Sequence, residues 1–340
     1  MRKLLNTLYV TTPESYLSKD GLNVVISVKQ KEVYRIPIVN IENIVTFGFM
    51  GASPGLMKLC ADNGVSLTFL SPAGRFIGRF QGPVKGNVLL RTRQYRLASD
   101  RKYSLSLARL FIAAKINNYR QILMRHLRDY GNNTDIEEAE RKLKNCKRLV
   151  LISTSSEELR GHEGDAASIY FSVFAHLSRT TDPVFLFKGR NRRPPRDAVN
   201  CMLSFVYTLI ANDCTAALES VGLDPYVGLF HTLRPGRTSL ALDIMEELRA
   251  YLGDRLVLSL INRRQVSGHD FISQGEDTVT TSDEGRKTII QAWQQRKKEI
   301  ITHPFLNEKI QIGLLPYVQS QLLARTIRDS SEIYPPFLIK

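Results

Sequence analysis

Three side chains that lie far apart in the sequence, Glu163, His231 and Glu246, could together hold a divalent metal ion. Two carboxylates and one imidazole form a mixed oxygen and nitrogen set, which suits Mg²⁺ or Mn²⁺ better than the thiolate-rich set of a structural zinc. The chain is also basic, with 47 lysines and arginines against 33 acidic residues and a formal net charge of +14. A hard cation in so basic a chain suggests chemistry on phosphates.

Two of these residues also have an ordinary structural interpretation. Glu163 follows Gly161-His162 at the expected start of a helix, where acidic residues commonly complement the helix dipole. The adjacent His162 is a rival ligand, but consecutive side chains on a helix diverge by about 100°, so both cannot easily serve one ion. A lone histidine such as His231, after the apolar turn 226–230, is usually a partly buried, hydrogen-bonded residue. The residue pattern leaves both interpretations open.

Three carboxylates lie off the apolar stripe of an expected helix over 239–262. Asp243, Glu246 and Glu247 occupy positions i, i+3 and i+4. Carboxylates this close repel one another unless cations hold them. An exposed acidic face explains the pattern equally well, and periodicity alone does not choose between the two.

Basic residues gather in two segments. Residues 86–130 carry 10 lysines and arginines against 2 acidic residues, and 91–103 interleaves them with tyrosines, which can clamp a nucleic-acid backbone and stack a base. A second basic segment, 188–196, precedes a helix expected from Pro194-Pro195, and guanidinium groups at a helix start suit phosphates. The predicted DNA-contact residues are Arg91, Arg93, Arg96, Arg190, Arg192, Arg193 and Arg196. A solvated linker is the alternative for the first segment.

Polar residues near these segments are candidate catalytic helpers. Asn200, Ser204 and Tyr207 follow one another at i, i+4 and i+7 in an otherwise apolar helix, so they form either a buried polar network or a wall that faces the substrate. Tyr170 lies seven residues after Glu163, on the same expected helix face. We predict helper roles for Tyr170, Asn200 and Ser204.

The elements that must position these residues follow from hydrophobic periodicity. Short apolar or alternating runs at 22–28, 33–39, 43–49, 66–70 and 76–80 predict strands, with one helix between Pro54 and Asn63-Gly64. Beyond residue 100 the chain shows almost no strand signal, and helical stretches are expected near 105–127, 135–160, 163–178, 195–220, 239–262 and 284–301. We therefore predict an α+β protein: a small N-terminal β-sandwich domain over 1–85, a linker over 86–100, and an all-α catalytic domain over 101–340.

Composition excludes several other classes of protein. The four cysteines lack C-x-x-C spacing, so neither a disulfide framework nor a zinc knuckle is expected. The first residues lack an adequate apolar signal segment, and no apolar run approaches the roughly 18–20 residues of a membrane span. No G-x-x-x-x-G-K-[ST] motif is visible, so the sequence gives no sign of an ATP-binding P-loop. We expect a cytoplasmic protein without membrane contact.

Four segments in order resemble a known family: LRGHEG at 159–164, RPPRDAVN at 193–200, GLDPYVGLFH at 222–231 and SLALDIMEELR at 239–249. The chain is similar over essentially its whole length to the CRISPR-associated integrase/endonuclease of spacer acquisition, the CRISPR-associated protein numbered one, and is closest in character to the type I-C branch. Each segment alone is a weak signal, but the combination is specific.

The resemblance implies a site, a fold and partners. Glu163, His231 and Glu246 match the family's metal ligands, for Mg²⁺ or Mn²⁺, which selects Glu246 from its acidic neighbours; some members have aspartate there. His162 replaces a residue that is often apolar. The family combines a β-sandwich with a helical domain and forms homodimers largely through the β-domain. Two such dimers flank a dimer of the small CRISPR-associated partner numbered two, in a heterohexameric complex.

The resemblance also implies a reaction on double-stranded and branched DNA. The 3′-hydroxyl of a captured fragment would attack a phosphodiester at the CRISPR repeat boundary, and the metal would lower the pKa of that hydroxyl and stabilise charge on the non-bridging oxygens. Two other functions remain open at this stage: a structure-specific DNA repair nuclease, and a non-catalytic DNA-binding scaffold whose acidic residues are surface charge.

Overall fold

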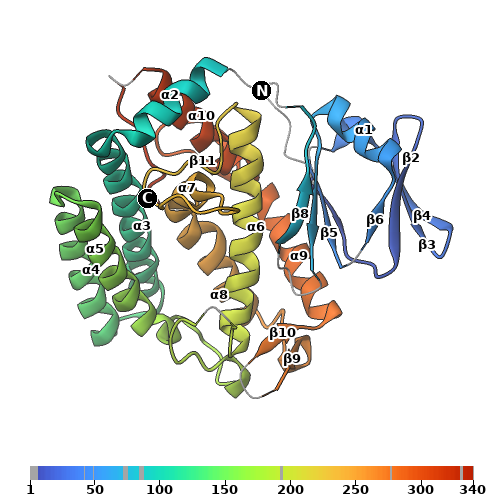
Figure 1. The fold of residues 1–340 in the computed structure, drawn as a ribbon. Coiled ribbons are helices and arrows are strands. Elements are labelled where there is room, and N and C mark those ends of the chain that lie inside the picture. The colour runs from blue at the N-terminus through green and yellow to red at the C-terminus, as the bar shows by residue number, and fades with distance from the viewer. Residues whose placement is uncertain are drawn as a thin grey trace. The chain divides into compact units, whose positions relative to one another are not determined.

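The chain forms two compact units, Met1–Lys85 (unit 1) and Gly86–Lys340 (unit 2) (Figure 1). The computed structural model describes residues 7–41, 43–48, 50–71, 76–83, 88–191, 194–275, 278–329 and 332–339. Unit 1 is rich in strands and unit 2 is largely helical, which confirms the predicted α+β class.

Unit 1 contains two four-stranded sheets. The strands are β1 (Thr7–Val10), β2 (Ser15–Asp20), β3 (Asn23–Val28), β4 (Lys31–Pro37), β5 (Asn43–Phe47), β6 (Gly51–Ala52), β7 (Ser66–Leu70) and β8 (Phe76–Phe80). One sheet has the order β1-β5-β7-β8, with β8 antiparallel to β7 and the other pairs parallel. The second has the order β4-β3-β2-β6, in which β6 pairs in parallel with β2 and the other pairs are antiparallel. The sequence predicted strands at β3, β4, β5, β7 and β8 but missed β1, β2 and the short β6.

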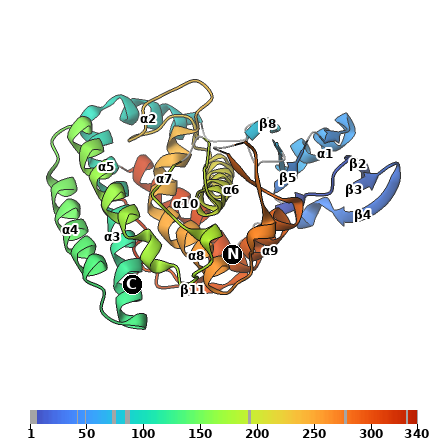
Figure 2. The ribbon, with the colours of Figure 1, turned by 90° about the horizontal axis from the view of Figure 1, so that it is seen from below.

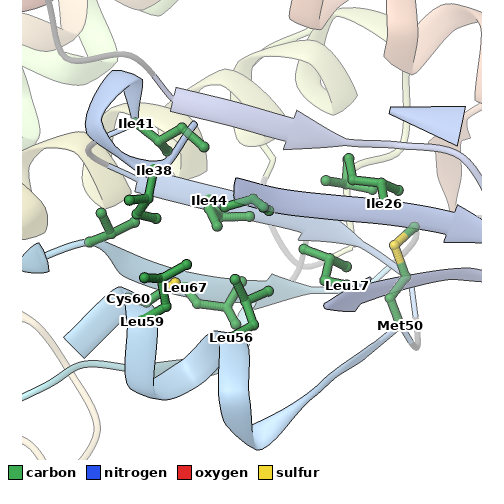
Figure 3. Packing of buried hydrophobic residues seen from close by; sticks show 13 residues of the cluster. Leu17, Ile26, Ile38, Ile41, Ile44, Met50, Leu56, Leu59, Cys60 and Leu67 are labelled. Carbon is green, nitrogen blue, oxygen red and sulfur yellow. The ribbon is translucent and has the colours of Figure 1, made fainter. Parts of the chain in front are cut away.

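The core of unit 1 joins both sheets and helix α1 (Pro54–Asn63) (Figure 3). Leu17 from one sheet, Ile44 from the other and Leu56 from α1 are fully buried in one cluster. The helix begins as its sequence predicts: Ser53 caps its N-terminus, Pro54 occupies the first turn, and Gly64 ends it in the left-handed conformation at φ 70°. A shared apolar core between two sheets is the defining feature of a sandwich.

Unit 2 is built from long helices with short 3₁₀ turns and two small ribbons. Its elements are α2 (Val88–Ser99), α3 (Arg101–Tyr130), α4 (Thr134–Ile152), α5 (Ser156–Ser172), α6 (Ala198–Ser220), α7 (Ser239–Arg249), the π-helical turn η4 (Ala250–Asp254), α8 (Arg255–Asn262), β9 (Phe271–Ser273), β10 (Val279–Thr281), α9 (Asp283–Lys298), β11 (Ile300–Thr302), β12 (Lys309–Gln311) and α10 (Leu315–Arg328). The antiparallel ribbons β9–β10 and β11–β12 are additions that the all-α prediction did not include.

Helix α7 lies between α3 and α6 in the interior of unit 2 (Figure 1). Helices α4 and α5 pack together against α3, and the view from below shows the three side by side (Figure 2). Helix α7 carries an almost unbroken series of buried residues, polar ones included. Its charged side chains must therefore find partners inside the protein, because an unpaired buried charge is very costly.

The stretch 86–100, predicted as a linker, instead contains helix α2. Leu90 and Gln94 are buried on one face of this helix, which packs against α3 and α10. Its other apolar residues do not share that face, since Val88, Leu89 and Tyr95 are exposed, so the amphipathic signal in the sequence is weak. Helix α2 is thus a part of unit 2 and not a connection to it.

Helix α6 is, among the described helices, long and apolar enough to cross a membrane by length and composition alone. Most of the apolar stretch is buried inside unit 2, as in the core helix of many globular proteins. The sequence predicted a helix near 195–220 but no apolar run of span length, because polar residues such as Asn200 and Ser204 interrupt the apolar stretch.

Candidate active site

Glu163, His231 and Glu246 come from three separate elements that meet beside helix α3. Glu163 lies on α5, His231 lies in the loop between α6 and α7, and Glu246 lies on α7. Helix α3 packs against both α5 and α7, and it contributes Lys115 at the meeting point. The fold therefore gathers residues as far apart in the chain as Lys115 and Glu246.

The ammonium group of Lys115 joins the two carboxylates. Its Nζ donates a short hydrogen bond to Glu163 Oε1 and lies 2.8 Å from Glu246 Oε2. The Lys115 side chain is 1% exposed, and those of Glu163 and Glu246 are 25% and 3% exposed. Because one ammonium contacts both carboxylates, the two acidic groups face a common point.

Glu246 is surrounded by cations. Arg249, one turn further along α7, donates from Nη2 to Glu246 Oε1 at 2.8 Å. Burial alone raises the pKa of Glu246, but the positive charges of Arg249 and Lys115 and the nearby His231 outweigh it and lower that pKa. Burial lowers the pKa of Lys115, and the charge of Glu246 reverses the effect, so its pKa is raised. Both groups are therefore charged at neutral pH.

His231 is held by Asp243, one turn before Glu246 on α7. The Asp243 carboxylate accepts backbone hydrogen bonds from Leu229, Phe230 and His231, and its Oδ1 lies 2.7 Å from His231 Nδ1. An ionised carboxylate only accepts, so Nδ1 carries a proton, and in the neutral ring Nε2 then keeps its lone pair. That Nε2 lies 4.0 Å from Glu246 Oε1. Asp243 thus sets both the ring's orientation and its tautomer.

The loop that carries His231 fits tightly over α7 and α2. A Cβ atom at Gly228 would lie 2.7 Å from Ser239 Cβ and 3.0 Å from Asp243 Oδ2, so this position has no room for a side chain. On the other side of the loop, the Gln94 amide of α2 bonds Asp224 and Val227. These contacts explain how the long loop between α6 and α7 presents one histidine at a fixed place.

The donor set fits a hard divalent cation. Two carboxylates and an imidazole Nε2 converge, and metal-binding histidines usually donate their other ring N–H to a carboxylate, as His231 does to Asp243. Glu246 Oε2 is buried and, although close to Lys115, has no aligned hydrogen-bond partner among the described groups. In the part of the chain that the structure describes, no three histidine, cysteine or acidic residues are spaced closely enough to hold an ion as they stand. The Lys115 ammonium lies between two of the donors.

The structure excludes the ordinary interpretation of Glu163. Helix α5 begins at Ser156, where Ser155 caps it by accepting from Glu158, so Glu163 lies in the second turn and beyond the reach of the helix terminus. The sequence placed the helix start too late because it expected the preceding helix to continue to residue 160. His162 points away from the site, toward Glu158 at 3.7 Å, as the divergence of neighbouring helical side chains predicts.

The alternative of an exposed acidic face on α7 is wrong. Asp243, Glu246 and Glu247 are all buried, and each faces different partners. Glu247 accepts from the hydroxyl of Tyr334, the amide of Gln319 and the backbone N–H of Phe337. It therefore anchors the segment 332–339 and does not face the site.

The predicted helpers belong to a buried polar network. Asn200 and Ser204 of α6 accept hydrogen bonds from Arg190, whose guanidinium also lies over the ring of Tyr207. Tyr170 is fully buried and stacks on Tyr119 at 3.8 Å between ring centroids. The stripe on α6 thus forms the network and not an open wall. A helper role for Tyr170, Asn200 and Ser204 remains a prediction.

The predicted DNA-contact arginines differ in the exposure of their side chains. Arg93, Arg96 and Arg196 have exposed side chains, whereas Arg91 donates to the carbonyl of Gly222 and is half-buried. Arg190 is engaged inside the protein, as described above. Arg192 and Arg193 lie outside the described residues.

Sequence reasoning missed three residues of the site: Lys115, Asp243 and Arg249. The signal for Lys115 is its position as a lone charge in the apolar run 111–116 of α3. A long-chain cation that interrupts a buried helix face must find an anionic partner. Asp243 was considered only as a rival of Glu246, and its role depends on a loop conformation that spacing does not reveal.

The chain is similar to curated proteins over its full length. It is 52% identical over 341 residues to "CRISPR-associated endonuclease Cas1 1" of Chlorobaculum tepidum, covering 99% of each chain. It is 46% identical to "CRISPR-associated endonuclease Cas1 2" of Rhodospirillum rubrum, covering 100% of both, and 42% identical to a Cas1 endonuclease of Moorella thermoacetica, again covering 100% of both.

Solved structures share the fold at low sequence identity. A casposase bound to an integration product matches with a TM-score of 0.83 and 23% identity, covering 97% of this chain and 94% of that one. A CAS1 protein of Thermotoga maritima matches with a TM-score of 0.83 and 21% identity, covering 95% and 97%. A chain of a Cas6-RT-Cas1–Cas2 complex matches at a TM-score of 0.84 and 21% identity; all of this chain is covered, which spans 36% of that longer one.

A family model decides the membership. The model described as "CRISPR associated protein Cas1" matches residues 8–295, which include Glu163, His231 and Glu246. This protein belongs to the Cas1 family of CRISPR-associated proteins.

Proposed function

We propose that this protein is a metal-dependent DNA endonuclease and integrase that inserts short foreign DNA fragments into a CRISPR array. The main support for this proposal is that Glu163 and Glu246 both contact the buried ammonium of Lys115, while His231 Nε2 lies 4.0 Å from Glu246 Oε1. The curated relatives at 42–52% identity are named CRISPR-associated endonucleases, and the casposase of matching fold is bound to an integration product. The type I-C assignment remains a prediction.

The proposed metal ligands are Glu163, His231 and Glu246, and Mg²⁺ or Mn²⁺ is the proposed ion. Bound there, the ion would supply a Lewis acid that lowers the pKa of a DNA 3′-hydroxyl and offsets charge on the phosphate. The chain's own residues provide the rest of the arrangement. Asp243 fixes the His231 tautomer, and Arg249 fixes the Glu246 carboxylate through Oε1. Fixed donors need no reorganisation as the reaction proceeds.

The proposed reaction exchanges one phosphodiester for another. The 3′-oxygen of the fragment forms a bond to phosphorus in the array, and the bond from that phosphorus to the array's own 3′-oxygen breaks. The proton of the attacking hydroxyl passes to solvent, and the leaving 3′-oxygen takes a proton from solvent to become a new 3′-hydroxyl. The number of phosphodiester bonds is unchanged, so no nucleotide triphosphate is consumed.

The proposed DNA path includes the exposed arginines Arg93 and Arg96 of α2 and Arg196 before α6. Arg91, Arg190, Arg192 and Arg193 complete the predicted set, although Arg91 and Arg190 are partly engaged within unit 2. The proposed partners are double-stranded and branched DNA, a second copy of this chain joined through unit 1, and Cas2 in a heterohexamer. The solved Cas6-RT-Cas1–Cas2 complex motivates the choice of Cas2. The proposed location is the cytoplasm.

The test is plasmid integration by the purified full-length protein. A labelled double-stranded fragment with free 3′-hydroxyls is incubated with a plasmid that carries the CRISPR repeat, with Mg²⁺, with Mn²⁺ or with EDTA, and with and without Cas2. We expect joined product only with a divalent ion, and most of it with Cas2. A parallel reaction with a fragment that ends in 3′-dideoxy nucleotides should give none.

Other outcomes would favour the alternatives. Cutting of branched DNA at full rate, with no repeat-directed joining under any condition, would identify a structure-specific repair nuclease. Binding of DNA without cutting or joining in either metal would identify a non-catalytic scaffold and refute the proposed site.

A further inference from the structure

We infer that Lys115 is an internal cation that gathers Glu163 and Glu246 and competes with the divalent ion for them. This inference rests on the proposed function, since it takes these two residues as metal ligands. Lys115 lies on α3, outside the four segments at 159–164, 193–200, 222–231 and 239–249 that resemble the family.

The position of Lys115 supports this role. Its side chain is 1% exposed, and its Nζ contacts one oxygen of each carboxylate, on two different helices. No other described acidic group forms an ion pair with it. Its Nζ lies over the ring of Tyr119, 5.8 Å from the ring centroid. The ammonium therefore lies where two ligands of a metal would meet.

Charge balance explains why the residue is needed. Two carboxylates that face one point, Glu246 buried and Glu163 half-buried, repel each other more strongly than they would in water. Arg249 neutralises only the Glu246 side, through Oε1. Lys115 supplies a charge to both carboxylates and so keeps them together before an ion binds. The ammonium then competes with the metal ion, because an ion that binds both carboxylates must displace the ammonium from at least one of them.

The test compares Mn²⁺ affinity in matched variants of the full-length protein, using Mn²⁺ alone as the probe. Free Mn²⁺ is followed by electron paramagnetic resonance, and thermal unfolding is recorded with and without the ion. In Lys115→Met we expect Mn²⁺ to bind about tenfold more tightly or better, and the rise in Tm on adding Mn²⁺ to increase. Lys115→Arg keeps the charge and should bind Mn²⁺ within about threefold of the original protein.

Lys297→Met is the matched control. Lys297 also lies buried in unit 2, pairs with Asp213 at 2.7 Å, and has its Nζ 5.8 Å from the ring of Trp293. Its removal takes the same charge from a buried pair that contains no proposed ligand. We expect it to lower Tm and leave the Mn²⁺ affinity unchanged.

The outcomes separate this inference from the proposed function. Equal or weaker Mn²⁺ binding in Lys115→Met, with Glu163→Ala still abolishing binding, would overturn the role of Lys115 and leave the ligands intact. Mn²⁺ binding that survives Glu163→Ala, or no binding by the original protein, would overturn the ligand assignment itself.

A second measurement does not depend on whether the variants fold. Crystals of the original protein with and without Mn²⁺ should differ at Lys115: with the ion bound, Nζ should leave hydrogen-bonding distance of at least one carboxylate. An ammonium that still bridges Glu163 and Glu246 beside a bound ion would overturn the inference.

Discussion

Glu246 and Glu247 are neighbours on helix α7, yet they belong to two different regions of unit 2. Glu246 faces Lys115, Arg249 and His231, three groups that are or can be cationic. Glu247 points about 100° away and accepts hydrogen bonds from neutral donors on α10 and on the segment 332–339. Both side chains are buried, so burial does not distinguish them.

The difference shows that surroundings assign the role of a carboxylate. Burial raises the pKa of both groups, but cations reverse this effect at Glu246, whereas at Glu247 the hydrogen bonds from Tyr334, Gln319 and Phe337 only reduce it and leave a pKa of about 7. The cationic region can recruit and orient a metal ion. The neutral region ties a distant segment of the chain to the helix that carries the site.

The largest effect is expected when a proposed metal ligand of the cationic region is removed without disturbing the fold. In Glu163→Ala we expect strand transfer to fall by about a thousandfold or more, because a metal site supplies several kcal/mol of charge stabilisation. Glu163 is 25% exposed, so thermal stability should change little. The measurement is plasmid joining in Mn²⁺, with Glu157→Ala on the exposed face of the same helix as the control. Joining within tenfold of the original protein would remove Glu163 from the ligand set.

The neutral region should respond in the opposite way. Glu247→Ala leaves Tyr334, Gln319 and the backbone of Phe337 without their acceptor, so we expect the free energy of unfolding to fall by about 3 kcal/mol or more. Urea unfolding measures this change, with exposed Glu138→Ala as the control. At temperatures where the variant is folded, Mn²⁺ affinity should be retained. Loss of Mn²⁺ binding with unchanged stability would contradict the separation of the two regions.

Asp254, the last residue of η4, tests whether a third buried carboxylate behaves like Glu247. Burial raises its pKa from 3.8 to about 6, even though Tyr207, Arg249, Tyr170 and Arg190 act to lower it. These groups lie on α6, α7, α5 and the basic segment 188–196, and Tyr119 of α3 also interacts electrostatically with Asp254.

Because the folded protein holds this proton more tightly than the unfolded chain, the contribution of Asp254 to stability is complete below about pH 3.8 and is lost as the pH rises through about 6. The total amounts to roughly 3 kcal/mol at most. We expect Asp254→Asn to remove this part of the decline in urea-unfolding stability between about pH 4 and pH 6. An unchanged pH profile would show that Asp254 is ionised throughout that range.

The smallest expected effect concerns the arginines of α2, outside both regions. Replacing exposed Arg93 and Arg96 together with glutamine should reduce the slope of log K against log salt by roughly two and leave joining chemistry intact once DNA is saturating. Arg91→Gln should behave differently, because it loses a hydrogen bond to Gly222 near the histidine loop. A salt slope that does not change in the double variant would remove α2 from the DNA path.

Much of the architecture could be read from the sequence. Ser53-Pro54 and Gly64 marked both ends of α1, and apolar runs located β3, β5 and β7 in unit 1. The weakest predictions fell where local signals were weak or conflicting: the apolar residues of α2 do not line one face, and the start of α5 depends on a serine cap within a polar stretch. Tertiary packing decided these elements.

The sequence by itself determined which chemical groups were available: two carboxylates and an imidazole with no thiolate partner, in a basic chain with helices that could carry them. It did not determine which carboxylate of α7 faces them, because a helical period of 3.6 residues sets relative directions and not the direction of the core. Only the packing of α7 between α3 and α6 pointed Glu246 toward Lys115 and Glu247 toward the segment 332–339. Contacts between residues more than a hundred positions apart follow from burying a shared core, and no local spacing encodes them.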